Sequence, residues 1–409
     1  MQNEKNPGVT VSHDRPTAGP TEPAPRVRAH DRRPLLCVAA MTIVFSSLVS
    51  CVSLFGLGPT EEELLAVNYT PEGIGDWAVS TPEAQGLDPL DVARLYYDAA
   101  QLETIYGLLV ARNGQLVAEG YWHGSDSSQK HNLTSVTKSY MGALVGKAIE
   151  QGYIESIDQC MVDYFPEFMP MHDPRKEEIT IRHLLQMRAG YPWEESSPEL
   201  FSKLWLEGFH VSDVVDIPLI RDPGTDHDYS NLSSHILGLI VARATDMDLR
   251  DYGQQNLFSL IDSEVGEWPI TWDYYRPGYG LIDFSARDAA KFGQLYLDDG
   301  LYAGNQVLPA AWVADSLKTY SEDAWDYRIG GNVKEIGYGY QWWLLRSGSH
   351  HYNMAWGHGG QVIMVVPDLE MVVVLTANPF FGQSDDESWR NEKANINLVA
   401  DFIAGLPNE

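Results

Sequence analysis

The pattern of apolar residues predicts a β-hairpin near the start of the folded region. Residues 105–110 form one apolar run and residues 115–122 form a second, with Asn113-Gly114 between them. Asn-Gly supplies the positive φ angles that a tight two-residue turn requires. We therefore expect two antiparallel strands joined at this turn.

A helical period follows the predicted hairpin. Apolar residues recur at helical spacing over residues 134–152, which open on a capping-type Thr134 and close on Gly152. The pattern also predicts shorter helices at 181–187, 233–244 and 286–297, strands at 338–345, 351–356, 361–366 and 371–377, and a closing helix at 395–403. The strands therefore come from both ends of the chain.

This order predicts an α+β fold, with an antiparallel β-sheet flanked by helices and an inserted, mostly helical domain. We assign residues 76–158 and 282–409 to the sheet domain and residues 159–281 to the helical domain. Residues 1–60 are assigned to a disordered N-terminus followed by an export leader or anchor, because residues 1–34 are rich in Pro, Arg and Thr and have no apolar period.

The leader is predicted from a run of 23 residues without a charge, 35–57, preceded by four arginines between residues 26 and 33. Leu48-Val49-Ser50-Cys51 resembles a bacterial lipobox, which would place a lipid on Cys51. An uncleaved membrane anchor and cleaved secretion remain open, because the apolar run reaches membrane-spanning length. All three alternatives place the body outside the cytoplasm, in the bacterial cell envelope, and the first two make the membrane a partner.

Charge narrows the classes of partner. The 409 residues include 28 Lys+Arg against 57 Asp+Glu, for a formal net charge of -29. Such a charge repels phosphate backbones, so nucleic-acid binding is not expected. The 12 His are scattered and no HExxH motif occurs, so we expect neither a metal nor another cofactor.

Ser135 and Lys138 stand three residues apart at the start of the predicted long helix. Positions three apart share a helix face, so the serine hydroxyl and the lysine ammonium can meet. Serine becomes a nucleophile only when a base takes its proton, and lysine can act as that base if burial lowers its pKa. The ordinary structural interpretation is a capped helix with an exposed lysine.

Two later segments also carry candidate chemistry. Tyr229 and Asn231 precede the predicted helix at 233–244; a phenol beside an ammonium is pushed toward phenolate and could relay a proton, and Asn231 could bind a substrate amide. The run Trp356-Gly357-His358-Gly359-Gly360-Gln361 lets backbone N–H groups approach a ligand, as an oxyanion hole requires. A helix-entry turn and a wide hairpin turn are the ordinary interpretations of these two segments.

The order Ser135-x-x-Lys138, Tyr229-x-Asn231 and a Gly-rich turn before a terminal strand resembles the serine β-lactamase and penicillin-binding-protein superfamily. The resemblance covers residues 76 to 405 and is closer to its class C-like branch, which includes esterases and 6-aminohexanoate-dimer hydrolases. It implies a β-lactamase/transpeptidase-like fold with a cleft between the two domains. It also implies Ser135 as the acylated nucleophile, with Lys138 and Tyr229 sharing the acid/base work.

The resemblance further implies an oxyanion hole and a substrate surface. Matching the family's cationic triplet to Ala355-Trp356-Gly357 makes Ser135 and His358 the oxyanion-hole donors and leaves alanine at the cationic position. A rival register starts the triplet at His358 and moves the second donor to Gln361. The substrate-binding residues are expected to be Asn231, Trp356, Gly357 and Gln361.

We therefore expect a serine hydrolase that acts on small-molecule ester or small amide bonds, with β-lactam and D-aminoacyl bonds as further classes. The alternative is a penicillin-binding or sensor-type protein that is acylated at Ser135 without efficient turnover.

Overall fold

The computed structural model describes residues 58–325, 329–382 and 384–408. The predicted leader and the lipidation candidate Cys51 lie outside these residues. Within the three described ranges, no helix is long and apolar enough to cross a membrane. The described residues from Pro59 onward form one compact unit, which holds the sheet and all the candidate catalytic residues.

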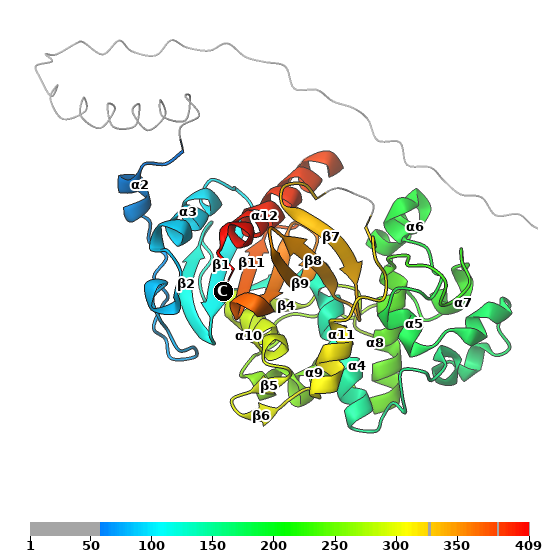
Figure 1. Cartoon of the computed structure of the whole chain (residues 1–409). Helices are drawn as coiled ribbons and strands as arrows, with labels where there is room; N and C mark the ends of the chain where they lie inside the picture. Colours follow the sequence, from blue (N-terminus) through cyan, green and yellow to red (C-terminus); the bar gives the residue numbers. More distant parts are fainter. Residues whose placement is uncertain (1–57, 326–328, 383, 409) are drawn as a thin grey trace, which may run out of the picture. The chain divides into compact units, whose positions relative to one another are not determined.

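The centre of the unit is a seven-stranded sheet in which all neighbouring strands are antiparallel (Figure 1). In spatial order the strands are β2 (Gln115–Tyr121), β1 (Ile105–Arg112), β11 (Met371–Ala377), β10 (Gln361–Val366), β9 (His350–Gly357), β8 (Trp343–Ser347) and β7 (Val333–Tyr338). The predicted fold class is confirmed. The pairing of Ile105 with Ala377 and of Arg112 with Met371 joins the two ends of the body.

The predicted hairpin is present. Asn113 and Gly114 have φ angles of 52° and 71°, which is the left-handed geometry of a tight two-residue turn. The turn pairs Arg112 with Gln115, and β2 continues antiparallel to β1 as the edge strand of the sheet.

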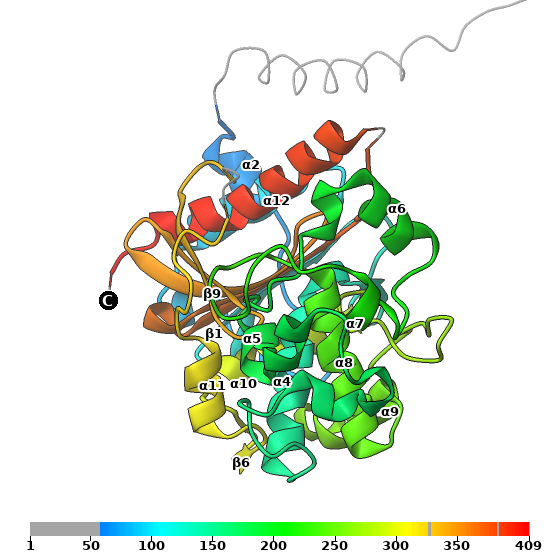
Figure 2. The ribbon, with the colours of Figure 1, turned by 90° about the vertical axis from the view of Figure 1, so that its right-hand side faces the viewer.

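Strands β10 and β11 are buried along their whole length because helices cover both faces of the sheet. Along β11, Val372 and Val374 enter one core cluster, whereas Val373 and Leu375 enter the other, as the two-residue period of a strand requires. One face packs against α3 (Pro89–Ala99) and α12 (Asp385–Gly405), and the other packs against α10 (Ala286–Leu297) and contacts α4 (Thr137–Glu150) (Figure 2).

Between residues 159 and 281 the described regular elements are helices and 3-10 turns. The helices are α5 (Ile181–Leu185), α6 (Pro198–Leu206), α7 (Asp213–Asp216), α8 (Asn231–Thr245) and α9 (Leu249–Asn256). The 3-10 turns are η4 (Met161–Tyr164), η5 (Pro166–Phe168), η6 (Pro174–Glu178), η7 (Glu194–Ser196) and η8 (Phe258–Ile261). The remaining elements are α2 (Glu61–Leu65), η2 (Glu83–Gln85), β3 (Lys130–Asn132), η3 (Thr134–Val136), β4 (Asp283–Ser285), β5 (Leu301–Tyr302), β6 (Asn305–Gln306), α11 (Ala310–Ser316) and η9 (Pro367–Leu369).

Two predicted elements differ from the structure. The strand predicted at 338–345 is wrong, because β7 ends at Tyr338, β8 begins at Trp343, and Gln341 between them has a φ of 61°. Gln341 is buried, and its amide donates to the carbonyls of Leu184 and Leu185, so it ties the turn to α5. The closing helix begins at Asp385, ten residues before the predicted start.

Candidate active site

Ser135 lies in the 3-10 turn η3, which leads directly into α4. The residue before it, Thr134, has a φ of 47°, and the side chain of Asn132 accepts a hydrogen bond from the Thr134 amide at 2.8 Å. The Thr137 hydroxyl donates to the Thr134 carbonyl at 2.6 Å. These bonds hold a sharp corner that leaves Ser135 partly exposed at the start of the helix.

The Lys138 side chain reaches back to Ser135 and is held by two further acceptors. Its Nζ atom lies 2.9 Å from the Ser135 Oγ atom, 2.8 Å from Oδ1 of Asn231 and 2.7 Å from the carbonyl oxygen of Tyr279. Lys138 is only 2 % exposed. Burial lowers its pKa to about 7, while the carboxylates of Glu195 and Glu194 act in the opposite direction. Near neutral pH a substantial fraction of this amine can therefore accept a proton.

Tyr229 lies against the same two groups. The Lys138 Nζ atom is 5.0 Å from the centroid of the Tyr229 ring, and the phenol has Ser135 as a hydrogen-bond partner. Burial raises the pKa of Tyr229 well above its usual range, and the bond with Ser135 only opposes that rise. Burial therefore opposes the expected push of the phenol toward phenolate. At neutral pH the phenol therefore keeps its proton.

Asn231 is fixed through its backbone by a buried carboxylate that the sequence did not single out. Glu194 accepts hydrogen bonds from the Ser230 hydroxyl at 2.9 Å and from the amides of Asn231 and Leu232 at 2.8 and 2.9 Å. It thereby caps the N-terminus of α8, where negative charge is favoured. The Asn231 side chain is left to accept from Lys138 and to donate to Glu195 at 3.2 Å.

The Gly-rich turn lies beside the Ser135 corner. The Thr134 hydroxyl donates to the His358 carbonyl at 3.2 Å, and a Cβ atom on Gly357 would overlap Thr134 Oγ1 and the Leu133 carbonyl. Glycine at 357 therefore allows the end of β9 to approach the nucleophile's turn. This contact places the His358 carbonyl beside Thr134, the residue that precedes Ser135.

Gln361 does not offer its side chain to a substrate. It is fully buried, its amide nitrogen donates to the Ala377 carbonyl at 2.6 Å, and its amide oxygen accepts from the Ala377 N–H at 2.8 Å. Its backbone pairs with Gly357 in the ladder between β9 and β10. Gln361 thus joins strands, which corrects its predicted role in substrate binding.

Aromatic rings surround Tyr229. The Trp343 ring stacks on Tyr229 at a centroid distance of 5.4 Å, and the Trp325 ring lies 6.1 Å from it. Trp356 extends the group through contacts of 5.4 Å with Trp343 and 5.5 Å with Trp325. Trp356 itself is only 7 % exposed. Its ring therefore packs against the other tryptophans and offers little surface for the predicted substrate contact.

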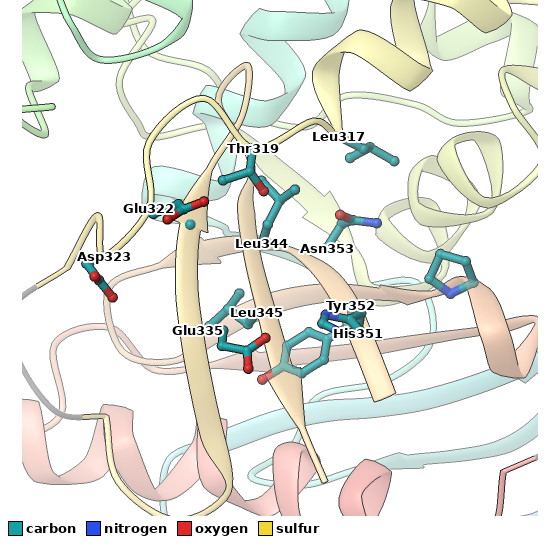
Figure 3. Close-up of a pocket in the computed structure, with 12 residues that line it drawn as sticks. Leu317, Thr319, Glu322, Asp323, Glu335, Leu344, Leu345, His351, Tyr352 and Asn353 are labelled. Carbon is teal, nitrogen blue, oxygen red and sulfur yellow. The ribbon is translucent and has the colours of Figure 1, made fainter. Parts of the chain in front are cut away.

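A separate hollow of about 520 Å³ lies where β7, β8 and β9 meet the segment after α11 (Figure 3). Figure 3 shows the carboxylates of Glu322, Asp323 and Glu335 along it, with His351 and Tyr352 on β9. Its lining residues include neither Ser135 nor Lys138 nor Tyr229. The chemical groups around Ser135 therefore form a distinct site.

Comparisons with known proteins identify the family of the chain. The family model described as Beta-lactamase matches residues 100–397. A curated relative, the 6-aminohexanoate-dimer hydrolase of Paenarthrobacter ureafaciens, is 26% identical over 307 residues, which are 71% of this chain and 76% of that protein.

Two solved structures share the fold. The D-amino acid amidase of Ochrobactrum anthropi SV3 is similar with a TM-score of 0.58 and 17% identity, covering 76% of this chain and 98% of the amidase. EstCE1, a hydrolase with promiscuous acyltransferase activity, is similar with a TM-score of 0.59 and 18% identity. The match covers 75% of this chain and 97% of the EstCE1 chain. The predicted superfamily and the predicted enzyme class, a hydrolase, are confirmed, and the chain belongs to the beta-lactamase family.

Proposed function

We propose that the protein is a serine hydrolase that forms an acyl-enzyme at Ser135 and acts on ester or small amide bonds. The observation that carries the proposal is the 2.9 Å contact between Lys138 Nζ and Ser135 Oγ, in a place where burial lowers the pKa of Lys138 to about 7. A base whose pKa lies near the working pH is suited to proton transfer.

In the proposed reaction the neutral Lys138 amine takes the proton of the Ser135 hydroxyl while Oγ attacks the substrate carbonyl. The N–H groups of Ser135 and His358 stabilise the negative charge that develops on the carbonyl oxygen. Tyr229, which is protonated, donates a proton to the leaving group and regains one from Lys138. Water then releases the acyl group from Ser135 with the same residues acting in reverse.

Two features support uncharged or weakly charged substrates. The position that is cationic in carboxylate-binding members of the family is Ala355, which is fully buried on β9. Tryptophan rings line the side of the site around Tyr229. A substrate carboxylate would therefore lack a partner on this strand, whereas an apolar acyl group would contact the partly exposed ring of Trp325. The hydrolase and amidase names of the relatives support esters and amides as the bond classes.

A fluorophosphonate probe and a panel of p-nitrophenyl esters, D-aminoacyl anilides and nitrocefin test the proposal. We expect labelling at Ser135 and steady-state release of p-nitrophenol, both lost in Ser135→Ala. Stoichiometric labelling by a β-lactam without turnover of any panel member would favour a penicillin-binding or sensor role instead. Ester hydrolysis that survives Ser135→Ala would overturn both functions.

We also propose that the enzyme works outside the cytoplasm, held to the bacterial envelope through its N-terminal leader. Leu48-Val49-Ser50-Cys51 is the feature that supports lipidation at Cys51. Metabolic labelling with a palmitate analogue tests this, and a Cys51→Ser variant that keeps the label and its membrane fraction would contradict it.

A further inference from the structure

One face of α12 holds the turn that carries the second oxyanion-hole donor of the proposed reaction. We call residues 356–359 the oxyanion loop. The position of this loop relative to Ser135 matters only if Ser135 is acylated, so the inference below rests on the proposed function. The residue at the centre of the contact is Glu392, to which the family resemblance gives no role.

Glu392 contacts three polar groups of the oxyanion loop. Its Oε1 atom accepts from the Trp356 indole N–H at 2.8 Å, and its Oε2 atom accepts from the Gly359 amide at 2.9 Å and lies 2.9 Å from Nδ1 of His358. Glu392 is only 4 % exposed. A carboxylate buried to this extent is costly unless several hydrogen bonds compensate it, and here the loop supplies them.

Neighbours of Glu392 on α12 bind the same loop. The Ser388 hydroxyl lies 3.1 Å from Nε2 of His358, and the Asn395 amide donates to the Gly359 carbonyl at 2.8 Å. Positions 388, 392 and 395 share one helix face because they are spaced by four and three residues. The loop is therefore bound along both its backbone and its side chains by a single rigid element.

The other edge of the oxyanion loop contacts the turn of the nucleophile. Gly357 packs against Leu133 and Thr134, and the Thr134 hydroxyl donates to the His358 carbonyl. The loop thus lies between the Ser135 turn on one side and Glu392 on the other. Releasing the α12 side would let the His358 N–H move away from the developing oxyanion while every acid/base group stays in place.

We propose that Glu392 is a positioning residue that fixes the His358 N–H opposite Ser135. Because an oxyanion forms only as the carbonyl is attacked, loss of this positioning lowers kcat more than it changes KM. Removal of a whole oxyanion-hole donor costs about 10²–10³ in rate, so partial misplacement should cost roughly tenfold to a hundredfold.

The test compares Glu392→Gln with Asp401→Asn. The amide introduced by Glu392→Gln keeps one acceptor oxygen but turns the other into a donor, so it cannot satisfy both the Trp356 and the Gly359 donors. Asp401→Asn is the matched control, because it makes the same chemical change on the same helix, at a side chain that accepts from Asn332 at 2.9 Å. We expect kcat to fall about tenfold or more in Glu392→Gln with KM within about twofold, and to stay within about twofold in the control.

A second variant and a ligand-binding measurement separate a positioning role of Glu392 from a loss of folding. Glu392→Asp retains the charge one methylene further back and should give an intermediate kcat, even if Glu392→Gln folds poorly by circular dichroism. A boronic acid that mimics the tetrahedral adduct should bind Glu392→Gln more weakly by the same factor as kcat falls, whereas a substrate analogue lacking the reactive carbonyl should bind equally. A merely structural role would not separate these two ligands.

The results distinguish this inference from the proposed function. Wild-type kcat and boronate affinity in folded Glu392→Gln and Glu392→Asp would overturn the positioning role while Ser135 chemistry stands. Absence of both hydrolysis and Ser135 labelling in the wild type would overturn the function, and the positioning role with it. Label on Ser388 instead of Ser135 would show that the chain Ser388, His358 and Glu392 is itself the nucleophilic group, which also contradicts the inference.

Discussion

The Nζ atom of Lys138, on the first turn of α4, lies 2.9 Å from the Oγ atom of Ser135 in the preceding turn η3. Burial and three acceptors hold the lysine in place. The contact matters because the lysine is almost fully buried and its pKa falls to about 7. An exposed lysine at the same spacing would keep its proton at neutral pH and could not act as a base.

The pH dependence of acylation should follow this pKa. Burial depresses the pKa of Lys138 relative to a free lysine, so the base form grows as pH rises through about 7. We expect the single-turnover acylation rate to rise about tenfold per pH unit well below pH 7 and to level off above it. Lys138→Met should lose about 10³-fold or more in rate at every pH, since no group replaces the base. A flat profile in the wild type would contradict the assignment.

Removing the Glu195 carboxylate should move that profile. Glu195 raises the pKa of Lys138 by stabilising its charged form, although burial outweighs it. Glu195→Gln keeps an oxygen that can accept from Asn231 but removes the charge. The acid limb should therefore move to lower pH by a few tenths of a unit, with the melting temperature almost unchanged because the residue is exposed. A shift of the acid limb to higher pH would contradict the prediction, because it would mean that the Glu195 carboxylate does not stabilise the charged form of Lys138.

Tyr229→Phe separates the phenol's chemistry from its packing. The ring keeps its stacking on Trp343, so the fold should persist, but the proton donor to the leaving group is lost. We expect kcat to fall about 10²–10³-fold for substrates with poor leaving groups, and less for p-nitrophenyl esters, whose leaving group needs no proton.

The matched control for Tyr229 is Tyr338→Phe. Tyr338 belongs to the same aromatic group, with its ring 6.3 Å from that of Tyr229, and its buried hydroxyl has no hydrogen-bond partner within the described residues. Its removal should leave kcat within about twofold. An equal loss in both variants would mean that ring packing, and not the Tyr229 proton, supports the reaction.

Gly357→Ala tests the approach of β9 to the nucleophile's turn. The added Cβ would overlap Thr134 and the Leu133 carbonyl, so the end of β9 must move away from Ser135. We expect about a hundredfold loss of kcat together with a lower melting temperature. Gly73→Ala is the control, because its Cβ would meet nothing within 4 Å. Full activity in Gly357→Ala would exclude a close role for this loop.

Much of the sheet was predictable from sequence, because short apolar runs and the Asn113-Gly114 turn report local geometry. The turn at Gln341 was not, since Tyr-Gly-Tyr-Gln-Trp-Trp has the composition of a strand and only the tertiary contacts with α5 explain the positive φ. A pattern cannot show that a polar residue is anchored by a distant helix.

For the site, motif order named Ser135, Lys138, Tyr229 and Asn231, and the structure brings these side chains together. The Tyr279 carbonyl carries no signal, because every residue has such a group. Glu392 carries none either, since an acidic residue in an acidic chain suggests solvent. The direction of the Tyr229 pKa also depends on burial, which a lone sequence does not give.

The most direct test is a peptide map of the protein after reaction with a slowly turned-over p-nitrophenyl ester, stopped by acid during the burst. The account predicts one acyl group per chain, on the peptide that contains Ser135, with a release rate equal to the steady-state kcat. Ser139→Ala, one turn further along α4, should leave the adduct unchanged, since its hydroxyl only donates to the Gln341 carbonyl. An acyl group on any other residue, or hydrolysis without an adduct in Ser135→Ala, would contradict the account.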